Sequence, residues 1–93
     1  MKAKIWNNNF WTEQTDPKEL KQKFEEVLKQ CGFNILAIEE HYFHPQGYTA
    51  LFLLAESHLA IHTFPECGKT YIELSSCNLD YYIKFLKLTE NLK

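Results

Sequence analysis

The 93-residue sequence contains no arginine, and no stretch approaches the roughly 20 apolar residues of a membrane-spanning helix. All ten cationic side chains are lysines, and the formal net charge is −2. Proteins that bind nucleic acids usually present a basic surface with arginines. We therefore expect neither a nucleic-acid nor a membrane partner. Residues 1–9 also lack the apolar run of a secretory signal.

Cysteine is scarce and does not follow a pairing pattern. The three cysteines, Cys31, Cys67 and Cys77, are odd in number and form no Cys-x-x-Cys motif. This usage is typical of thiols that stay reduced, so we expect a cytoplasmic protein.

Aromatic residues, in contrast, make up 15% of the sequence. A chain of this length is expected to form one domain over residues 1–93, which buries only about 65% of its unfolded surface. So many aromatics in a small core indicate additional burial, at a dimer interface or in a ligand pocket.

Two segments have the pattern of amphipathic helices. The first begins with Asp16 as N-cap and Pro17 in the first turn, carries apolar residues at helical spacing, and ends at Gly32. The second begins with Asn78 as N-cap. Its expected buried residues are Tyr82, Ile83, Leu86 and Leu92.

Four segments have the composition of strands: residues 33–40, 48–55, 59–64 and 69–77. Residues 4–6 are a candidate short first strand, followed by a loop to residue 15. Short connections between consecutive strands favour antiparallel pairing, with both helices on one face of the sheet. We therefore predict an α+β, two-layer sandwich that dimerises through the uncovered faces of the sheets.

A polar cluster, Ser57, His58, His62, Glu66 and Cys77, allows several interpretations. The residues could simply satisfy backbone groups, with Cys77 as a small buried apolar residue. A serine hydrolase would need a Gly-x-Ser-x-Gly elbow, which the sequence lacks. Self-processing by attack of Ser57 on the preceding carbonyl needs a strained turn, oxyanion donors and a base. His62 could be this base if the chain bends after Ser57.

A zinc site is a further interpretation, because His58 and His62 have the His-x3-His spacing. His41, His44 and Cys67 could add ligands. On a strand, however, His58 and His62 are about 13 Å apart, and only a helix brings positions i and i+4 together. Nearby isoleucine and threonine favour a strand, so no metal is expected.

The stretch "FHPQGYTALFLLAESHLAIHTFPE", with Cys77 after it, resembles the core of the bacterial and archaeal S-adenosylmethionine decarboxylase proenzymes. The family pattern is Phe-Ser-Pro-Gln-Gly, an apolar strand, Ala-Glu-Ser-His, Ile-His-Thr and aromatic-Pro-Glu. A cysteine then lies near the end of the next strand. The resemblance extends from Phe43 to Cys77, and His44 stands where the family has serine.

This resemblance implies cleavage between Glu56 and Ser57, which turns Ser57 into a pyruvoyl group. It assigns the assistance of processing to His62 and, where the family has serine, to Thr49. The pyruvoyl group would form a Schiff base with the substrate amine, without a metal or pyridoxal phosphate. Cys77 would be the proton donor of the decarboxylation.

The same resemblance implies S-adenosylmethionine as substrate and a homodimer with sites at its interface. Phe43 matches the aromatic residue that stacks on adenine, and Glu66 the carboxylate that binds the ribose hydroxyls. Glu56 and His58, on either side of Ser57, would contribute to the substrate pocket.

The N-terminal segment "AKIWNNNFWTEQTDP" departs from the family, which usually has a Gly-x-His and a Gly-Cys there. Trp6, Phe10 and Trp11 are either a second stacking surface or core. Three functions follow: an S-adenosylmethionine decarboxylase for spermidine synthesis, which we favour, a pyruvoyl decarboxylase of a basic amino acid, or an unprocessed homologue without activity.

Overall fold

The structure is a computed structural model that describes residues 3–93. It contains five strands, two α-helices and two 3-10 turns. In chain order these are β1 Trp6–Thr12, α1 Pro17–Cys31, β2 Ile35–Tyr42, β3 Tyr48–Leu54, β4 Ser57–Phe64, η1 Pro65–Cys67, β5 Lys69–Ser76, α2 Leu79–Leu88 and η2 Glu90–Leu92.

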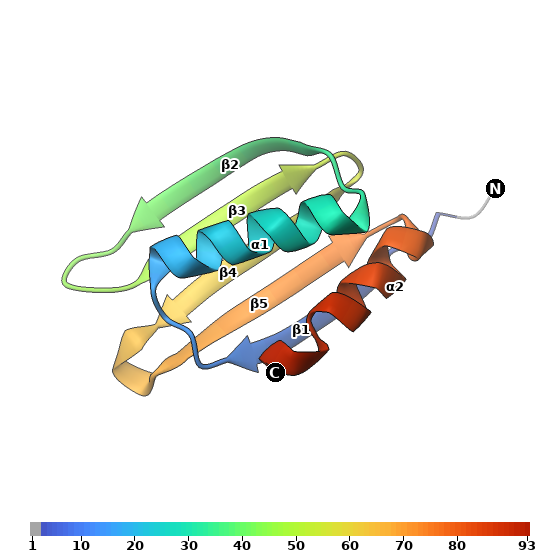
Figure 1. Ribbon diagram of the computed structural model, residues 1–93. Coiled ribbons are helices and arrows are strands. Elements are labelled where there is room, and N and C mark those ends of the chain that lie inside the picture. Colours follow the sequence, from blue (N-terminus) through green and yellow to red (C-terminus); the bar gives the residue numbers. More distant parts are fainter. Residues whose placement is uncertain (1–2) are drawn as a thin grey trace.

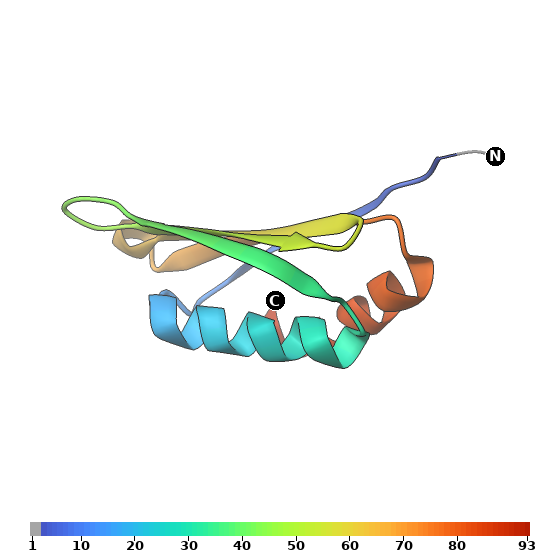
Figure 2. The same cartoon turned by 90° about the horizontal axis from the view of Figure 1, so that it is seen from above.

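The five strands form one antiparallel sheet in the order β1-β5-β4-β3-β2. Figure 1 shows α1 and α2 lying across this sheet, and Figure 2 shows that both cover the same face. The predicted α+β, two-layer architecture is therefore confirmed. No helix within residues 3–93 is long and apolar enough to cross a membrane.

The predicted loop over residues 7–15 is wrong, because most of this segment is strand β1. β1 pairs with β5 along its whole length, from Trp6 opposite Ser76 to Thr12 opposite Thr70. Three consecutive asparagines disfavour a strand in isolation. Pairing with β5 and burial of the Phe10 side chain outweigh that local preference.

The core lies between the sheet and the helices, because side chains alternate along the central strands. Every second residue of β3 and β4 is buried, from Tyr48 to Leu54 and from Ser57 to Thr63. α1 covers them with the apolar stripe that its sequence predicts: Leu20, Phe24, Val27, Leu28 and Cys31. Each fully buried Leu or Phe contributes about 1.5–3 kcal/mol.

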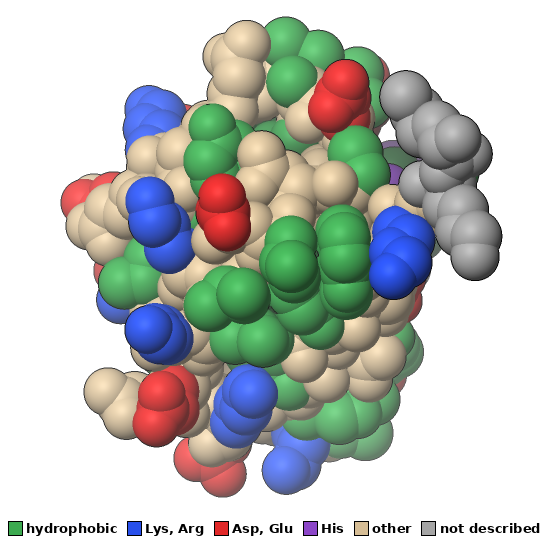
Figure 3. All heavy atoms as spheres, turned by 90° about the vertical axis from the view of Figure 1, so that its right-hand side faces the viewer, with side chains coloured by type: hydrophobic (Ala, Val, Ile, Leu, Met, Phe, Trp, Pro, Cys, Tyr) green, Lys and Arg blue, Asp and Glu red, His purple; other side chains and the backbone are tan. Residues whose placement is uncertain are grey.

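Tyr82 and Leu92 are partly buried against the core, as predicted, but burial along α2 differs from the prediction at one residue. Ile83, expected to be buried, is 42% exposed, whereas Phe85 is fully buried between the rings of Phe10 and Phe24. Leu79 is exposed together with Ile83. The side of the molecule on which α2 begins accordingly displays a group of hydrophobic side chains (Figure 3).

The other face of the sheet is uncovered, as the sequence predicts. It includes Leu51 and Leu53 of β3, which are 49% and 54% exposed. A shallow depression of about 450 Å³ lies over these two leucines and reaches His58. This open face is the side of the sheet that does not contact α1 or α2.

Replacement of Gly32 should be far more costly than replacement of Gly68. Gly32 has a φ of 110°, and a Cβ there would lie 2.7 Å from the Tyr81 ring. Gly68 has a φ of 65°, with no atom within 4 Å of such a Cβ. We expect Gly32→Ala to lower the free energy of unfolding by about 2–5 kcal/mol, from backbone strain plus overpacking, and Gly68→Ala by about 1 kcal/mol. Urea denaturation measures both, and equal losses would contradict this packing.

Candidate active site

A strained two-residue turn connects β3 to β4. Leu54 and Ser57 face each other at the end of the ladder, so only Ala55 and Glu56 form the connection. Glu56 has a φ of 61°, and it is the only non-glycine residue with a positive φ among residues 3–93. Glycine or asparagine usually occupies such a turn position, and another residue there costs about 1–3 kcal/mol. The strain lies directly before the Glu56–Ser57 peptide bond.

A cysteine thiol contacts the carbonyl of this peptide bond. Cys77 Sγ donates to the Glu56 carbonyl oxygen at 2.8 Å and lies 3.7 Å from the Glu56 carboxylate. β5 ends at Ser76, opposite Ser57, so the next residue reaches the turn. Cys77 is exposed, and the alternative prediction that it is a small core residue is wrong.

The serine of the turn is buried on the opposite, helix-covered side. β4 begins at Ser57, two residues earlier than predicted, and the Ser57 side chain faces the core side of the sheet with 9% of its surface exposed. Its hydroxyl donates to Ser76 Oγ at 3.0 Å. The nucleophile that the sequence predicts is therefore held in a defined orientation.

A small cavity of about 140 Å³ opens at this turn, lined by Glu56, Ser57, His58 and Cys77 together with Ile5, Ser75 and Ser76. Pockets that enclose a small organic ligand usually measure about 300–1,000 Å³. One protomer alone thus provides a recess at the turn, with room for part of such a ligand.

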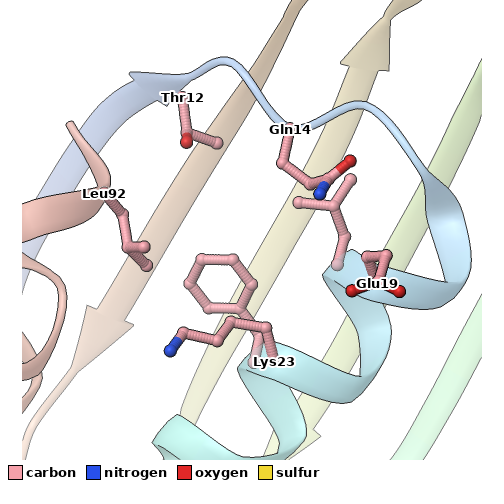
Figure 4. Close-up of a pocket in the computed structure, with 7 residues that line it drawn as sticks. Thr12, Gln14, Glu19, Lys23 and Leu92 are labelled. Carbon is pink, nitrogen blue, oxygen red and sulfur yellow. The ribbon is translucent and has the colours of Figure 1, made fainter.

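Another cavity, of about 170 Å³, lies away from the predicted site. Figure 4 shows it between the end of β1, the first turns of α1 and the C-terminal η2, with Thr12, Gln14, Glu19, Lys23 and Leu92 around it. None of the residues that the sequence singles out for catalysis lines this cavity. It marks a gap between α1 and η2 on the helix-covered side.

Thr49 and His62 form a second polar arrangement, on the open face. They are opposite each other on β3 and β4, and Thr49 Oγ1 lies 3.0 Å from His62 Nδ1 in a hydrogen bond. The His62 ring stacks on Tyr71, whose hydroxyl donates to Glu73 at 2.7 Å. That hydrogen bond lowers the pKa of the Glu73 carboxyl group. Tyr71 and Glu73 are neighbours of His62 that the sequence analysis did not identify.

The structure does not bring His62 to Ser57 within one protomer. β4 continues as a strand from Ser57 to Phe64, without the bend that a contact requires. The two residues are five positions apart, on opposite faces and separated by about 16 Å along the strand. His58 and His62 are also kept apart by the strand, so the interpretation that these two histidines bind one zinc ion is wrong. In residues 3–93, no three His, Cys, Asp or Glu side chains gather in a way that could hold a metal.

The connection from β2 to β3 and the turn η1 after β4 lie at the end of the sheet away from the β3–β4 turn (Figure 1). Phe43 follows β2, and its exposed ring contacts His41 edge-on at 4.5 Å between centroids. Glu66 is in the exposed turn η1, after β4. Neither residue approaches Ser57 in the same protomer.

The predicted site residues therefore fall into two groups. We call the first the turn group: Glu56, Ser57, His58 and Cys77. We call the second the far group: Phe43, Thr49, His62 and Glu66.

The N-terminal aromatic residues differ in their burial. Phe10 belongs to the core. Trp11 is exposed on the open face, where it packs against Tyr71 and Phe64 with centroids 5.3 and 5.8 Å apart. Trp6 is half-buried at the start of β1.

The fold is that of a two-layer α+β protein with a serine-bearing turn. Sequence comparison identifies the family of this protein. The sequence model of the S-adenosylmethionine decarboxylase family matches residues 11–93. The chain belongs to this family, as its sequence predicts.

Three relatives illustrate this similarity, each named S-adenosylmethionine decarboxylase proenzyme. The protein of Brevibacillus brevis is 38% identical over 80 residues, which cover 77% of this chain and 60% of the relative. That of Prochlorococcus marinus is 42% identical over 62 residues, covering 67% and 50%. That of Methanococcus aeolicus is 38% identical over 58 residues, covering 62% and 50%. The chain thus spans about half the length of these relatives.

A solved structure has the same fold. The crystal structure of the adenosylmethionine decarboxylase from Aquifex aeolicus superposes with a TM-score of 0.73 and 21% sequence identity. The superposition covers 95% of this chain and 77% of that one.

The three thiols should react at different rates in the folded protein. Burial raises the pKa of Cys31 to about 11, whereas Cys67 and Cys77 are exposed. Because the thiolate is the reactive form, we expect an excess of Ellman's reagent at pH 8 to modify Cys67 and Cys77 rapidly and Cys31 only after unfolding. Peptide mapping after a short exposure identifies the modified residues. Labelling of Cys31 in the folded chain would contradict its burial.

Proposed function

We propose that this chain is a self-processing proenzyme that cleaves itself between Glu56 and Ser57 and becomes a pyruvoyl-dependent S-adenosylmethionine decarboxylase. The observation that carries the proposal is the contact of the Cys77 thiol with the carbonyl of the strained Glu56. Membership of the family supports the same activity. Residues 1–93 would act as one domain, in the cytoplasm.

The turn supplies two features that an internal acyl shift requires, a strained residue and a donor at the carbonyl oxygen. Ser57 Oγ attacks the carbonyl carbon of Glu56, the bond from that carbon to the Ser57 nitrogen breaks, and the hydroxyl proton passes to this nitrogen. The Cys77 S–H is already directed at the oxygen on which negative charge develops. Relief of the backbone strain at Glu56 would favour the change from a planar peptide to the tetrahedral intermediate by about 1–3 kcal/mol.

The resulting ester is then removed by β-elimination. The first fragment leaves with a new carboxylate at Glu56, and residue 57 becomes dehydroalanine. Addition of water releases ammonia and leaves a pyruvoyl group as the new N-terminus of the second fragment. When present, this group supplies the electron sink that decarboxylation of an amino acid requires. Cys77, next to residue 57, would protonate the α-carbon of the product.

The separation of the two groups supports a homodimer. The turn cavity of about 140 Å³ is small, and the far group lies at the other end of the same sheet. Two open faces that pack about a two-fold axis would cover Leu51 and Leu53. In such a dimer, His62 and Thr49 of one protomer would lie near the Glu56–Ser57 turn of the other.

The chemistry of the far group supports a nucleoside substrate. Phe43 offers an exposed ring for adenine, and Glu66 an exposed carboxylate for the ribose hydroxyls. Among the described residues, one acidic side chain, Glu56, lines the turn cavity. A basic amino acid substrate would favour an acidic pair there, so S-adenosylmethionine is the better match. The decarboxylated product would serve spermidine synthesis.

Ser57→Ala should remain one uncleaved chain without decarboxylase activity, because it lacks the attacking hydroxyl. Intact mass under denaturing conditions should give two fragments for the wild type, residues 1–56 and a pyruvoyl-blocked 57–93. Cys67→Ala, an exposed substitution at the other end of the sheet, is the control and should cleave normally. A wild-type chain that stays intact for days would identify an unprocessed homologue, and turnover by Ser57→Ala would refute the pyruvoyl mechanism.

Processing should also occur between protomers. His62→Ala alone should cleave slowly, and Ser57→Ala cannot cleave. If the two variants are produced together with different tags, mixed dimers pair an intact His62 with an intact Ser57. We expect the His62→Ala chain to recover cleavage in these dimers, as read by the mass of its tagged fragment. Absence of recovery in isolated mixed dimers would show that His62 does not act across the interface.

A further inference from the structure

The Ser57 hydroxyl is connected to a residue of β5 that neither the sequence pattern nor the proposed reaction uses. Ser57 Oγ donates to Ser76 Oγ at 3.0 Å, and the two residues are opposite each other in the β4–β5 ladder. Ser76 is 1% exposed. The hydrogen bond is therefore shielded from water, which would otherwise compete for the Ser57 hydroxyl.

The Ser76 oxygen is itself fixed by the main chain of Asn78, the N-cap of α2. The Asn78 N–H donates to Ser76 Oγ at 3.0 Å, and Ser76 Oγ donates to the Asn78 carbonyl at 3.3 Å. A serine hydroxyl can donate one hydrogen bond and accept two. With the bond from Ser57, all three positions of Ser76 are used, so its oxygen is held from three directions.

We infer that Ser76 is the positioning residue that aims the Ser57 hydroxyl at the Glu56 carbonyl. This inference rests on the proposed self-processing of the chain. Ser76 accepts the hydroxyl hydrogen, which leaves the lone pairs of Ser57 Oγ free to form the new bond. In the acyl shift itself this hydrogen passes to the Ser57 nitrogen as the peptide bond breaks, so Ser76 is unchanged by the reaction.

Ser76 and Cys77 hold the two reacting groups from consecutive positions. Ser76, on the helix-covered side, orients the hydroxyl, and Cys77 contacts the carbonyl oxygen at 2.8 Å. Alternate residues of a strand point to opposite sides, which lets the end of β5 reach both partners of the reaction. Loss of one orienting contact of this kind commonly slows a positioned reaction by up to about 100-fold.

The test is the time course of self-cleavage of the full-length chain, followed by intact mass. We expect Ser76→Ala to cleave about 10- to 100-fold more slowly than the wild type, and Ser76→Thr, which keeps the hydroxyl, to remain within about threefold. Hydroxylamine, which releases fragment 1–56 from the ester, should trap correspondingly less ester in Ser76→Ala. A smaller amount of trapped ester would show that the attack of Ser57 is slowed, whereas a slower β-elimination would leave the amount of ester unchanged or higher.

Thr70→Ala is the matched control. Thr70 is on the same strand and the same face, is fully buried, and donates to a main-chain oxygen, that of Gln14. Its loss should destabilise the fold by about 1 kcal/mol without slowing cleavage. Thermal unfolding of each variant shows whether stability and cleavage change together.

Wild-type cleavage by Ser76→Ala would overturn the inference, as would a folded Ser76→Thr that is as slow as Ser76→Ala. Slow cleavage by Thr70→Ala would also overturn it, because general destabilisation would then explain the effect. If Ser76→Ala does not fold, Ser76→Cys is the substitute, because a thiol is similar in size to the hydroxyl but forms only weak hydrogen bonds. Cleavage of Ser76→Cys at the wild-type rate would refute the role of Ser76. An intact wild-type chain would instead overturn the proposed function, and this inference with it.

Discussion

Hydrogen-bonding register between β4 and β5 aligns Ser57 with Ser76, and the rest of the candidate site depends on this alignment. Because Ser57 is the first residue of β4, the connection from β3 has only two residues, and Glu56 adopts a left-handed conformation to close it. The same register delivers Cys77, one residue beyond Ser76, to the Glu56 carbonyl. A shift by one residue would turn every side chain to the other face and remove both contacts.

The strands on either side allow this turn to carry strain without loss of the fold. β3 pairs with β2 as well as β4, and β4 pairs with β5 as well as β3. Buried Leu54, Leu59 and Leu74 anchor the three strands next to the turn. A break in the chain at the turn would release about 1–3 kcal/mol of backbone strain, while each strand kept its other neighbour and its core residues. The location of the strained bond is therefore compatible with a chain that remains folded after cleavage.

Local features of this protein could be predicted from its sequence, and features that depend on distant pairing could not. The side chain of Asp16 caps α1 and Gly32 ends it, as their sequence signals indicate, because each acts within one helical turn. Residues 4–6 were predicted as a short first strand, but most of β1 was missed because its asparagines have low strand propensity and its partner β5 is about 60 residues away. The phase of α2 is set by the space between Phe10 and Phe24, which Phe85 fills.

The candidate site shows the same division. Glu56 and Ser57 are adjacent in sequence, so the resemblance to the family was sufficient to propose them as candidates. Ser76 could be found only from the register of β4 and β5, since its own sequence context is an ordinary strand end. The separation of His62 from Ser57, in contrast, follows from simple alternation. Five positions is an odd number, and odd spacings on a strand lead to opposite faces.

The proposed dimer would also account for the uncovered face of the sheet. Both α1 and α2 lie on one face of the sheet. The other face retains exposed Leu51 and Leu53 beside the far group. In the proposed dimer, a two-fold axis between two such faces and perpendicular to their strands would bring opposite ends of the sheets together, which is the relation between the turn group and the far group. Burial of the apolar face and completion of the site would then be achieved by the same association.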